Sequence, residues 1–330
     1  MRTLYFLVPG TTGKFACGGL FAELNALALA QQVCAAEVVT YRQREPDTLF
    51  LADVLQQPRL DVIFVLSWGF DVPKLAKQLR SHHTIYHAHS SGYGFRVPAG
   101  TPIITVSRNT MGYWGQLAPH SLIYYLPNQI SDQFQNRGQP RDIDVLVQAR
   151  KSSHYLLEQL VPALKEQCNV FVLDAFVDDL SELFNRAKVY LYDSAEYWAR
   201  EGVSEGFGLQ PMEAAACGCQ VFSSVNGGLS DYLDPGFNSH KIAGYSCEFD
   251  VQRVLAALSA SLPLSIAEPV FTEYRSDNIV QRLQVILTEV NQFFDHKEMH
   301  LSNIQPLTSR RIAQLRVQKL WQKLRTKFKR

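Results

Sequence analysis

The sequence predicts an α/β protein with two Rossmann-like, doubly wound domains that face a cleft, followed by a basic C-terminal helix. Three observations lead to this prediction. Short β-branched or aromatic runs alternate with helical patterns of about 10 to 15 residues, which is typical of parallel β-α-β units. The alternation stops at a polar stretch near the middle of the chain and then restarts. Residues 309–330 carry nine Lys or Arg and no acid.

The first half of the chain forms the expected N-terminal domain, residues 1–136. Its helical patterns cover 18–32 and 72–81. Because crossover connections in a parallel sheet are right-handed, such helices cover the faces of the sheet. The expected strands are the runs at 3–9, 36–42, 61–67, 83–89 and 102–107.

The polar segment PNQISDQFQNRGQPRD (127–142) marks the expected domain boundary. The second domain is expected over 137–300, and residues 301–330 form a tail. In open parallel sheets ligands bind at the carboxyl ends of the strands, so the cleft between the domains is the predicted site. The expected elements of the second domain are strands at 142–148, 169–176, 188–194 and 219–224, helices at 153–167, 178–187 and 211–217, and a closing helix at 275–295.

The composition is typical of a globular enzyme, with 46% apolar and 19% charged residues among 330. No apolar run approaches the roughly 18 to 20 residues that cross a bilayer. The first residues lack a small-residue cleavage site and are expected to form a strand rather than a signal peptide. Six cysteines without a C-x-x-C pair indicate reduced thiols and a cytoplasmic protein. No nucleic acid partner is expected, because no recognised binding module is present.

The stretch EGFGLQPMEAAACG (205–218) predicts an anion site. Gly206 and Gly208 leave backbone amides that a ligand can approach without obstruction by a Cβ. Pro211 suits the first position of a helix. The unpaired amides and the dipole at a helix N-terminus attract negative charge, so a diphosphate fits there.

Two glutamates lie eight residues apart around this turn, Glu205 and Glu213. Carboxylates repel a diphosphate, unless they accept hydrogen bonds from hydroxyl groups beside it. A nucleotide sugar supplies such hydroxyls on both sides of its diphosphate. The alternative is that Glu213 is a capping carboxylate in the first helical turn and Glu205 a solvated loop residue.

The run EGFGLQPMEAAACGCQVFSS closely resembles the E-x7-E signature of group 1 glycosyltransferases, the family 4 type with the two-domain GT-B fold. A weaker similarity covers about 3–295 and includes VPGTTGKFACGGLFAELNALA, IYHAHS and DVLVQARK. The resemblance implies a retaining glycosyltransferase of the hexosyltransferase type. Its co-substrate is a nucleotide diphosphate sugar, and it needs no metal or other cofactor.

The resemblance also assigns roles within the signature. Glu213 would hold the ribose hydroxyls of the donor. Glu205, the first expected catalytic residue, would contact the transferred sugar near its reacting end. Backbone amides of the turn would position the sugar and the diphosphate: Gly206, Phe207, Gly208 and Leu209.

A basic pair from the second domain would bind the diphosphate and stabilise the charge that develops on the leaving group. Arg150 matches the arginine of the family. Lys151 is adjacent to it, whereas the family usually places its lysine several residues later. The alternative for Lys151 is therefore a solvated loop lysine.

The first domain would contribute two glycines and a histidine. Gly18 and Gly19 would bring amides to the diphosphate from the start of a helix; the alternative is an ordinary strand-to-helix turn. His89 is the second expected catalytic residue, because it would face the donor sugar. His87 lies two residues earlier on the same face of the strand and remains open for this role. No metal site is expected, because no acidic D-x-D pair precedes a polar loop.

The resemblance thus implies sugar transfer from a nucleotide diphosphate sugar to a glycan or lipid-linked acceptor, as in polysaccharide biosynthesis. The acceptor would bind on the side of the first domain and the nucleotide sugar in the second. One alternative is a non-catalytic GT-B-like binding module. Another is a dinucleotide-dependent oxidoreductase, but no complete G-x-G-x-x-G opens a helix after the first strand.

The tail is expected to be a basic amphipathic helix, which is typical of binding to an anionic membrane surface. Without 309–330 the chain has 23 basic and 31 acidic residues, a net charge of about −8. The protein is therefore expected in the cytoplasm, attached peripherally to the inner face of the cell membrane. The alternative is that the apolar stripe packs on the body of the protein. This stripe consists of Ala313, Val317, Leu320, Trp321, Leu324 and Phe328.

Overall fold

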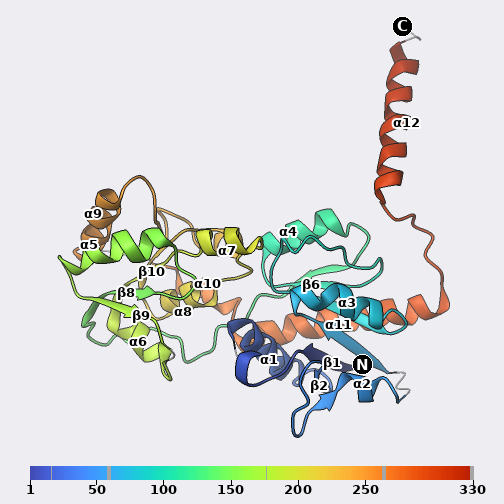
Figure 1. Ribbon diagram of the computed structural model, residues 1–330, viewed down its shortest axis with the longest axis horizontal. Coiled ribbons are helices and arrows are strands. Elements are labelled where there is room, and N and C mark those ends of the chain that lie inside the picture. Colours follow the sequence, from blue (N-terminus) through green and yellow to red (C-terminus); the bar gives the residue numbers. More distant parts are fainter. Residues whose placement is uncertain (16, 58–60, 176, 262–264, 328–330) are drawn as a thin grey trace.

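The computed structural model describes the chain except for residues 16, 58–60, 176, 262–264 and 328–330. It contains two α/β domains side by side and a helix that stands apart from both (Figure 1). Each domain has its own parallel sheet, and buried apolar side chains form a core on both faces of each sheet. The prediction of two doubly wound domains is confirmed.

The first domain is built on a seven-stranded sheet in the order β3-β2-β1-β4-β5-β6-β7, and all neighbouring strands are parallel. All five predicted strands are present, and two very short ones, β3 and β7, were not predicted. The strands are β1 (Thr3–Val8), β2 (Ala36–Thr40), β3 (Leu49–Phe50), β4 (Val62–Leu66), β5 (His83–Ala88), β6 (Ile103–Thr105) and β7 (Ile123–Tyr125), and the helices are α1 (Gly18–Ala30), α2 (Leu51–Val54), α3 (Val72–Gln78) and α4 (Arg108–Leu117).

The second domain has a five-stranded parallel sheet in the order β12-β11-β10-β8-β9. The four predicted strands are present, and the two-residue β12 was not predicted. The strands are β8 (Ile143–Gln148), β9 (Val170–Leu173), β10 (Ala187–Tyr192), β11 (Gln220–Ser223) and β12 (His240–Lys241). The helices are α5 (Val161–Lys165), α6 (Leu180–Arg186), α7 (Ala195–Glu201), α8 (Leu209–Ala216), α9 (Cys247–Leu258) and α10 (Glu268–Thr272).

The closing helix, α11 (Ser276–Met299), packs on the first domain rather than on the second, to which the sequence assigned it. Its apolar face, which includes Leu283 and Leu287, joins the core beneath β1, β4 and β5. Arg2, at the start of the chain, forms an ion pair with Asp295 at 2.7 Å. A helical pattern shows which face of a helix is apolar but not which sheet that face will cover, which explains the difference.

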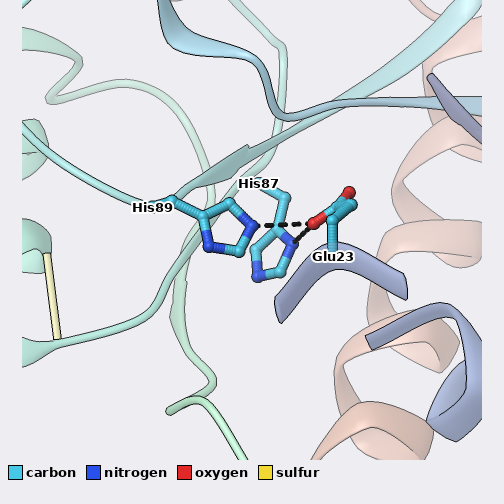
Figure 2. A group of neighbouring side chains, drawn as sticks. All are labelled: Glu23, His87 and His89. Atoms are coloured by element: carbon cyan, nitrogen blue, oxygen red, sulfur yellow. Dashed lines mark hydrogen bonds and ion pairs between the residues drawn. The ribbon is translucent and has the colours of Figure 1, made fainter. Parts of the chain in front are cut away.

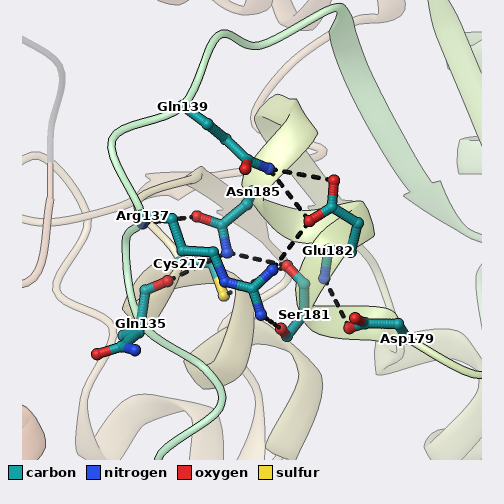
Figure 3. A network of polar contacts seen from close by, with 8 residues as sticks. All are labelled: Gln135, Arg137, Gln139, Asp179, Ser181, Glu182, Asn185 and Cys217. Atoms are coloured by element: carbon teal, nitrogen blue, oxygen red, sulfur yellow. Dashed lines mark hydrogen bonds and ion pairs between the residues drawn. The ribbon is translucent and has the colours of Figure 1, made fainter.

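The segment that links the two domains is held to the second domain by hydrogen bonds (Figure 3). The backbone amide of Arg137 donates to Asn185 Oδ1 at 2.8 Å, and its guanidinium donates to Glu182 Oε2 at 2.9 Å. Ile130 and Phe134 precede the predicted boundary but lie buried in the core of the second domain. The second domain therefore begins earlier in the chain than residue 137.

The C-terminal helix α12 (Ser309–Lys327) projects away from both domains (Figure 1). The alternative prediction, packing of its stripe on the body, is therefore wrong for the described residues; Phe328 of the stripe lies outside them. Within the part of the chain that the structure describes, no helix is both long and apolar enough to span a bilayer. All six cysteines are free, as predicted.

Candidate functional site

The loops at the carboxyl ends of the two sheets meet directly. The hydroxyls of Ser90 and Ser91, after β5, bond to the carbonyl and the hydroxyl of Ser204 in the second domain. The amide of Ser204 donates to the carbonyl of Ser91 at 3.0 Å. A Cβ on Gly206 would lie 1.5 Å from the carbonyl oxygen of His89, so this contact requires glycine. The Glu-turn-Glu stretch thus lies at the seam between the domains.

The helix after the turn begins two residues earlier than predicted. Gly208 has a φ of +79°, which glycine adopts without strain, and α8 starts directly after it. Pro211 is the third helical residue rather than the first, and Glu213 lies in the second turn rather than the first. The prediction was wrong because proline is tolerated throughout a first turn, whose amides have no partner in the helix. Glu213 is therefore not a capping carboxylate.

Glu205 is buried and hydrogen-bonded within its own domain. Its Oε2 accepts from Tyr192 Oη at 2.6 Å, from Trp198 Nε1 at 2.7 Å and from Ser194 Oγ at 3.2 Å. These donors come from β10 and from the segment through α7. The alternative prediction of a solvated loop residue is wrong, because the residue is only 7% exposed. Three donors to one oxygen fix the orientation of the carboxylate at the seam.

The other side chains of the turn have structural roles. The ring of Phe207 is buried and packs against Tyr232 and Tyr274, with centroid distances of 5.6 Å to each. Its side chain is thus committed to the core, and its backbone is what a ligand could contact. Leu209 is half-buried and lines a recess together with His87 of the first domain.

Glu213 differs from Glu205, because its carboxyl group has no hydrogen bond or ion pair with any residue that the structure describes. It is half-buried, and burial raises its pKa to about 8. An isolated carboxyl group in a desolvated place is costly unless hydrogen-bond donors are supplied. Ligand hydroxyls would supply them.

Lys151 lies at the site despite its unusual position in the sequence. Its backbone has a φ of +65°, and its Nζ is 4.3 Å from the centre of the Trp198 ring, whose Nε1 binds Glu205. Burial lowers the pKa of Lys151; the charge of Glu205 opposes this shift and that of Arg150 adds to it. The alternative of a solvated loop lysine is wrong. Arg150 itself is exposed.

Gly18 and Gly19 form the exposed N-terminus of α1. A Cβ on Gly18 would meet no described atom within 4 Å, and one on Gly19 would meet only the Cys17 sulfur at 3.9 Å. The Cys17 thiol is close enough to influence the pKa of Lys151. This end of α1 is therefore open to a ligand at both glycines.

The sequence missed Glu23, whose carboxylate reaches the neighbouring rings of both histidines from one side (Figure 2). Its Oε2 is 2.6 Å from His87 Nδ1 and 2.7 Å from His89 Nε2. Burial alone would raise the pKa of Glu23, but the charges and hydrogen bonds of the histidines lower it to about 2. Burial lowers the pKa of His89. A detectable signal was present, because Glu23 is the one charged residue in the helical run GGLFAELNALALA.

Within the described residues, Glu23, His87 and His89 are also the one group of three side chains close enough to hold a metal ion, with ligand atoms within 4.8 Å of one another. A carboxylate with two imidazoles is a donor set that zinc accepts. The short contacts between these groups are, however, ordinary charge-assisted hydrogen bonds.

The second domain matches a known protein family. Residues 145–262 match the family model described as glycosyl transferases group 1. This match covers most of the second domain, from β8 through α9, and includes Glu205 and Glu213. The predicted resemblance to group 1 glycosyltransferases is confirmed over these residues. No curated protein matches the chain.

Solved structures share the fold over most of the chain. A glycosyltransferase from Rickettsia africae has a TM-score of 0.65 and 12% identity, over 88% of this chain and 99% of that one. Anabaena HepE in complex with UDP and glucose has a TM-score of 0.54 and 13% identity, over 91% and 100%. A GtfA/B complex has a TM-score of 0.54 and 16% identity; the match covers 76% of this chain but 63% of that one. The predicted GT-B fold is confirmed.

Proposed function

We propose that this protein is a retaining glycosyltransferase that transfers a sugar from a nucleotide diphosphate sugar to a glycan or lipid-linked acceptor. One observation carries the proposal: the carboxyl group of Glu213 has no partner among the described residues, and it lies on the helix that leaves the turn whose first carboxylate, Glu205, three donors fix at the seam between the two domains. The hydrogen bonds of Glu205 stabilise its own domain, whereas the desolvated carboxyl group of Glu213 costs stability. Both suit a ligand with hydroxyl groups on either side of a diphosphate.

Each part of the donor is assigned to the residues that would bind it. Glu213 accepts hydrogen bonds from the ribose hydroxyls, and Glu205 lies at the transferred sugar. The N-termini of α1 and α8 offer unpaired amides to the phosphates. Arg150 and Lys151 neutralise the diphosphate as it leaves, which stabilises charge that develops in the transition state.

In the transfer step, the bond between the anomeric carbon and the diphosphate oxygen breaks. The acceptor hydroxyl oxygen bonds to the same face of that carbon. The proton of this hydroxyl passes to the departing diphosphate. Glu205 and Glu213 do not act as the acid and the nucleophile of a glycosidase, because one binds the sugar and the other the ribose.

A donor screen without acceptor tests the proposal. Slow hydrolysis of one nucleotide sugar, detected by chromatography, should identify the base and the sugar together. HepE was solved with UDP and glucose, so uridine donors come first. Glu205→Gln and Glu213→Ala should abolish turnover, whereas Glu166→Ala, at an exposed position after α5, should leave it intact. Wild-type rates in both site variants would refute the assignment.

The two alternative functions predict different results with the same purified protein. A non-catalytic binding module would show a melting shift with a nucleoside diphosphate but no turnover with any donor and acceptor. An oxidoreductase would be stabilised by dinucleotides instead. The half-buried carboxyl group of Glu213, without a partner among the described residues, favours a site that still binds ligand hydroxyls over a relic. The match of residues 145–262 to glycosyl transferases group 1 favours the glycosyltransferase over an oxidoreductase.

We further propose that α12 binds an anionic membrane surface, where a lipid-linked acceptor would be found. Its Lys and Arg residues surround apolar side chains that are 38–62% exposed. In such a helix the basic residues bind anionic lipid headgroups and the apolar face enters the membrane interface. These side chains are Leu315, Val317, Leu320, Trp321 and Leu324.

Co-sedimentation with vesicles of mixed phosphatidylcholine and phosphatidylserine tests this second proposal. The full chain should bind such vesicles, and a chain ending at residue 308 should not. Trp321→Ala should weaken binding with no change in the melting temperature, because Trp321 is 62% exposed. Equal binding of the full and shortened chains would remove the membrane proposal.

A further inference from the structure

We propose that Glu23 is a positioning residue. Its carboxylate accepts a hydrogen bond from His89 Nε2–H and thereby holds the ring in this tautomer. His89 Nδ1 is then left to accept a hydrogen bond from a hydroxyl of the transferred sugar. The ligand part of this proposal rests on the proposed function. The part that concerns the ring of His89 does not.

The contacts determine which ring nitrogens carry hydrogen. Glu23 is 2% exposed and ionised, and a carboxylate can only accept hydrogen bonds. The nitrogens that reach it, His87 Nδ1 and His89 Nε2, must therefore both donate. A neutral imidazole has one N–H, so Nδ1 of a neutral His89 carries a lone pair. Burial keeps His89 neutral, since it lowers the pKa of this ring.

The free nitrogen of His89 is available to a ligand. No described residue bonds to Nδ1, and this atom is not among the enclosed polar atoms without partners. The ring is 16% exposed, and the backbone of the same residue packs against Gly206 at the seam. His89 therefore presents an acceptor beside the Glu-turn-Glu stretch, from a backbone that cannot shift.

The cluster leaves one buried carboxylate oxygen unsatisfied, and this local cost indicates a functional purpose. Both rings contact the same oxygen, whereas Glu23 Oε1 points away from them, buried and without a partner among the described residues (Figure 2). An unsatisfied buried polar group costs about 1–3 kcal/mol. An apolar residue would fit the helix without this cost. Two imidazoles on one oxygen are instead what fixes the orientation of both rings.

Histidine NMR tests the proposal without any substrate. In protein labelled with ¹⁵N-histidine, long-range ¹H–¹⁵N spectra report which nitrogen of each ring is protonated. The His89 signals, assigned with His89→Gln, should show a single Nε2–H form from pH 6.5 to 8.5. Among the titratable groups, Glu23 and His87 are those that face this ring. An Nδ1–H form, or an exchanging mixture, in the wild type would overturn the proposal.

Two variants separate positioning from general damage. Glu23→Gln should replace the single form of His89 by an exchanging mixture. Glu37→Gln, at an exposed position on β2, should leave the histidine spectrum unchanged. If Glu23→Gln does not fold, the wild-type spectrum alone decides. Stoichiometric zinc in the purified protein, with loss of the Nε2–H signal, would also overturn the proposal in favour of a metal site.

Kinetics with the donor found in the screen test the ligand part. Glu23→Gln should lower kcat at least tenfold and change the donor KM less than threefold. Glu23→Asp should recover part of kcat, and Glu37→Gln should behave as the wild type. Unchanged kcat in Glu23→Gln would refute the role toward the sugar. If no donor turns over at all, the proposed function fails, while the NMR result still decides the state of His89.

Discussion

Glu23 and Glu213 occupy similar places in the two domains, and their surroundings are opposite. Each lies in the second turn of a helix that starts near the seam, α1 in one case and α8 in the other. Burial would raise the pKa of Glu23, but two imidazoles lower it to about 2, whereas burial without a partner raises the pKa of Glu213 to about 8. The charge of each carboxyl group therefore depends on its hydrogen-bond partners rather than on burial alone. One oxygen of Glu23 has two partners within the first domain, whereas the carboxyl group of Glu213 has none among the described residues.

The largest expected effect concerns Glu213. Glu213→Ala should weaken binding of a nucleoside diphosphate about 100-fold above pH 8, where Glu213 is ionised, because hydrogen bonds to a charged group contribute about 1.5–3 kcal/mol each. Isothermal titration calorimetry measures this, with Glu166→Ala as the control. An unchanged dissociation constant would mean that Glu213 does not touch the nucleotide, and the comparison of the two glutamates would lose its functional meaning.

Glu23 should show the opposite dependence of stability on pH. Its pKa is lower in the folded chain than in the unfolded chain, so its contribution is present above about pH 4.5 and is lost as the pH falls toward 2. Glu23→Gln should therefore lower the free energy of unfolding by about 3 kcal/mol at pH 7, and by less at pH 3.5. Urea unfolding at both pH values measures this. A loss that grows toward low pH would contradict the ionised state of Glu23.

Glu213 should destabilise the fold where it is ionised. Its folded pKa of about 8 lies above the ordinary 4.5, so stability falls as the pH rises from 4.5 to 8. Glu213→Gln should raise the free energy of unfolding by about 2 kcal/mol at pH 8.5 and by almost nothing at pH 4.5. Urea unfolding with Glu166→Gln as the control measures the difference. An equal gain at both pH values would assign the effect to packing instead of charge.

The sequence predicted the parts of the fold and site that local pattern determines. Strand and helix alternation located every strand of four residues or more, and the E-x7-E run located Glu205 and Glu213. The three strands that escaped, β3, β7 and β12, have only two or three residues, and periodicity needs a longer window. The start of α8 was misplaced because Pro211 fits several positions of a first turn.

The sequence could not show the features that depend on which elements pack against each other. The apolar face of α11 was visible, but its place on the first sheet was not. Glu23 stood out as a charge in an apolar helix, yet its meaning required α1 to lie against the end of β5. Gly206 was read as access for a ligand, whereas in the structure the backbone of His89 occupies the space where its Cβ would be.

The smallest expected effect compares the glycine turns at the starts of α1 and α8. A Cβ on Gly18 meets no described atom within 4 Å, and its φ is not in the left-handed region, so Gly18→Ala should change the free energy of unfolding by less than about 0.5 kcal/mol. If the end of α1 faces the diphosphate, the added methyl group should still weaken nucleotide binding about threefold, since the phosphates approach the backbone there. Calorimetry on Gly18→Ala and on Gly112→Ala, another glycine with open space around its Cβ, measures both quantities. Equal affinity in the two variants would place the diphosphate on α8 alone and leave the first domain to bind the sugar through His89.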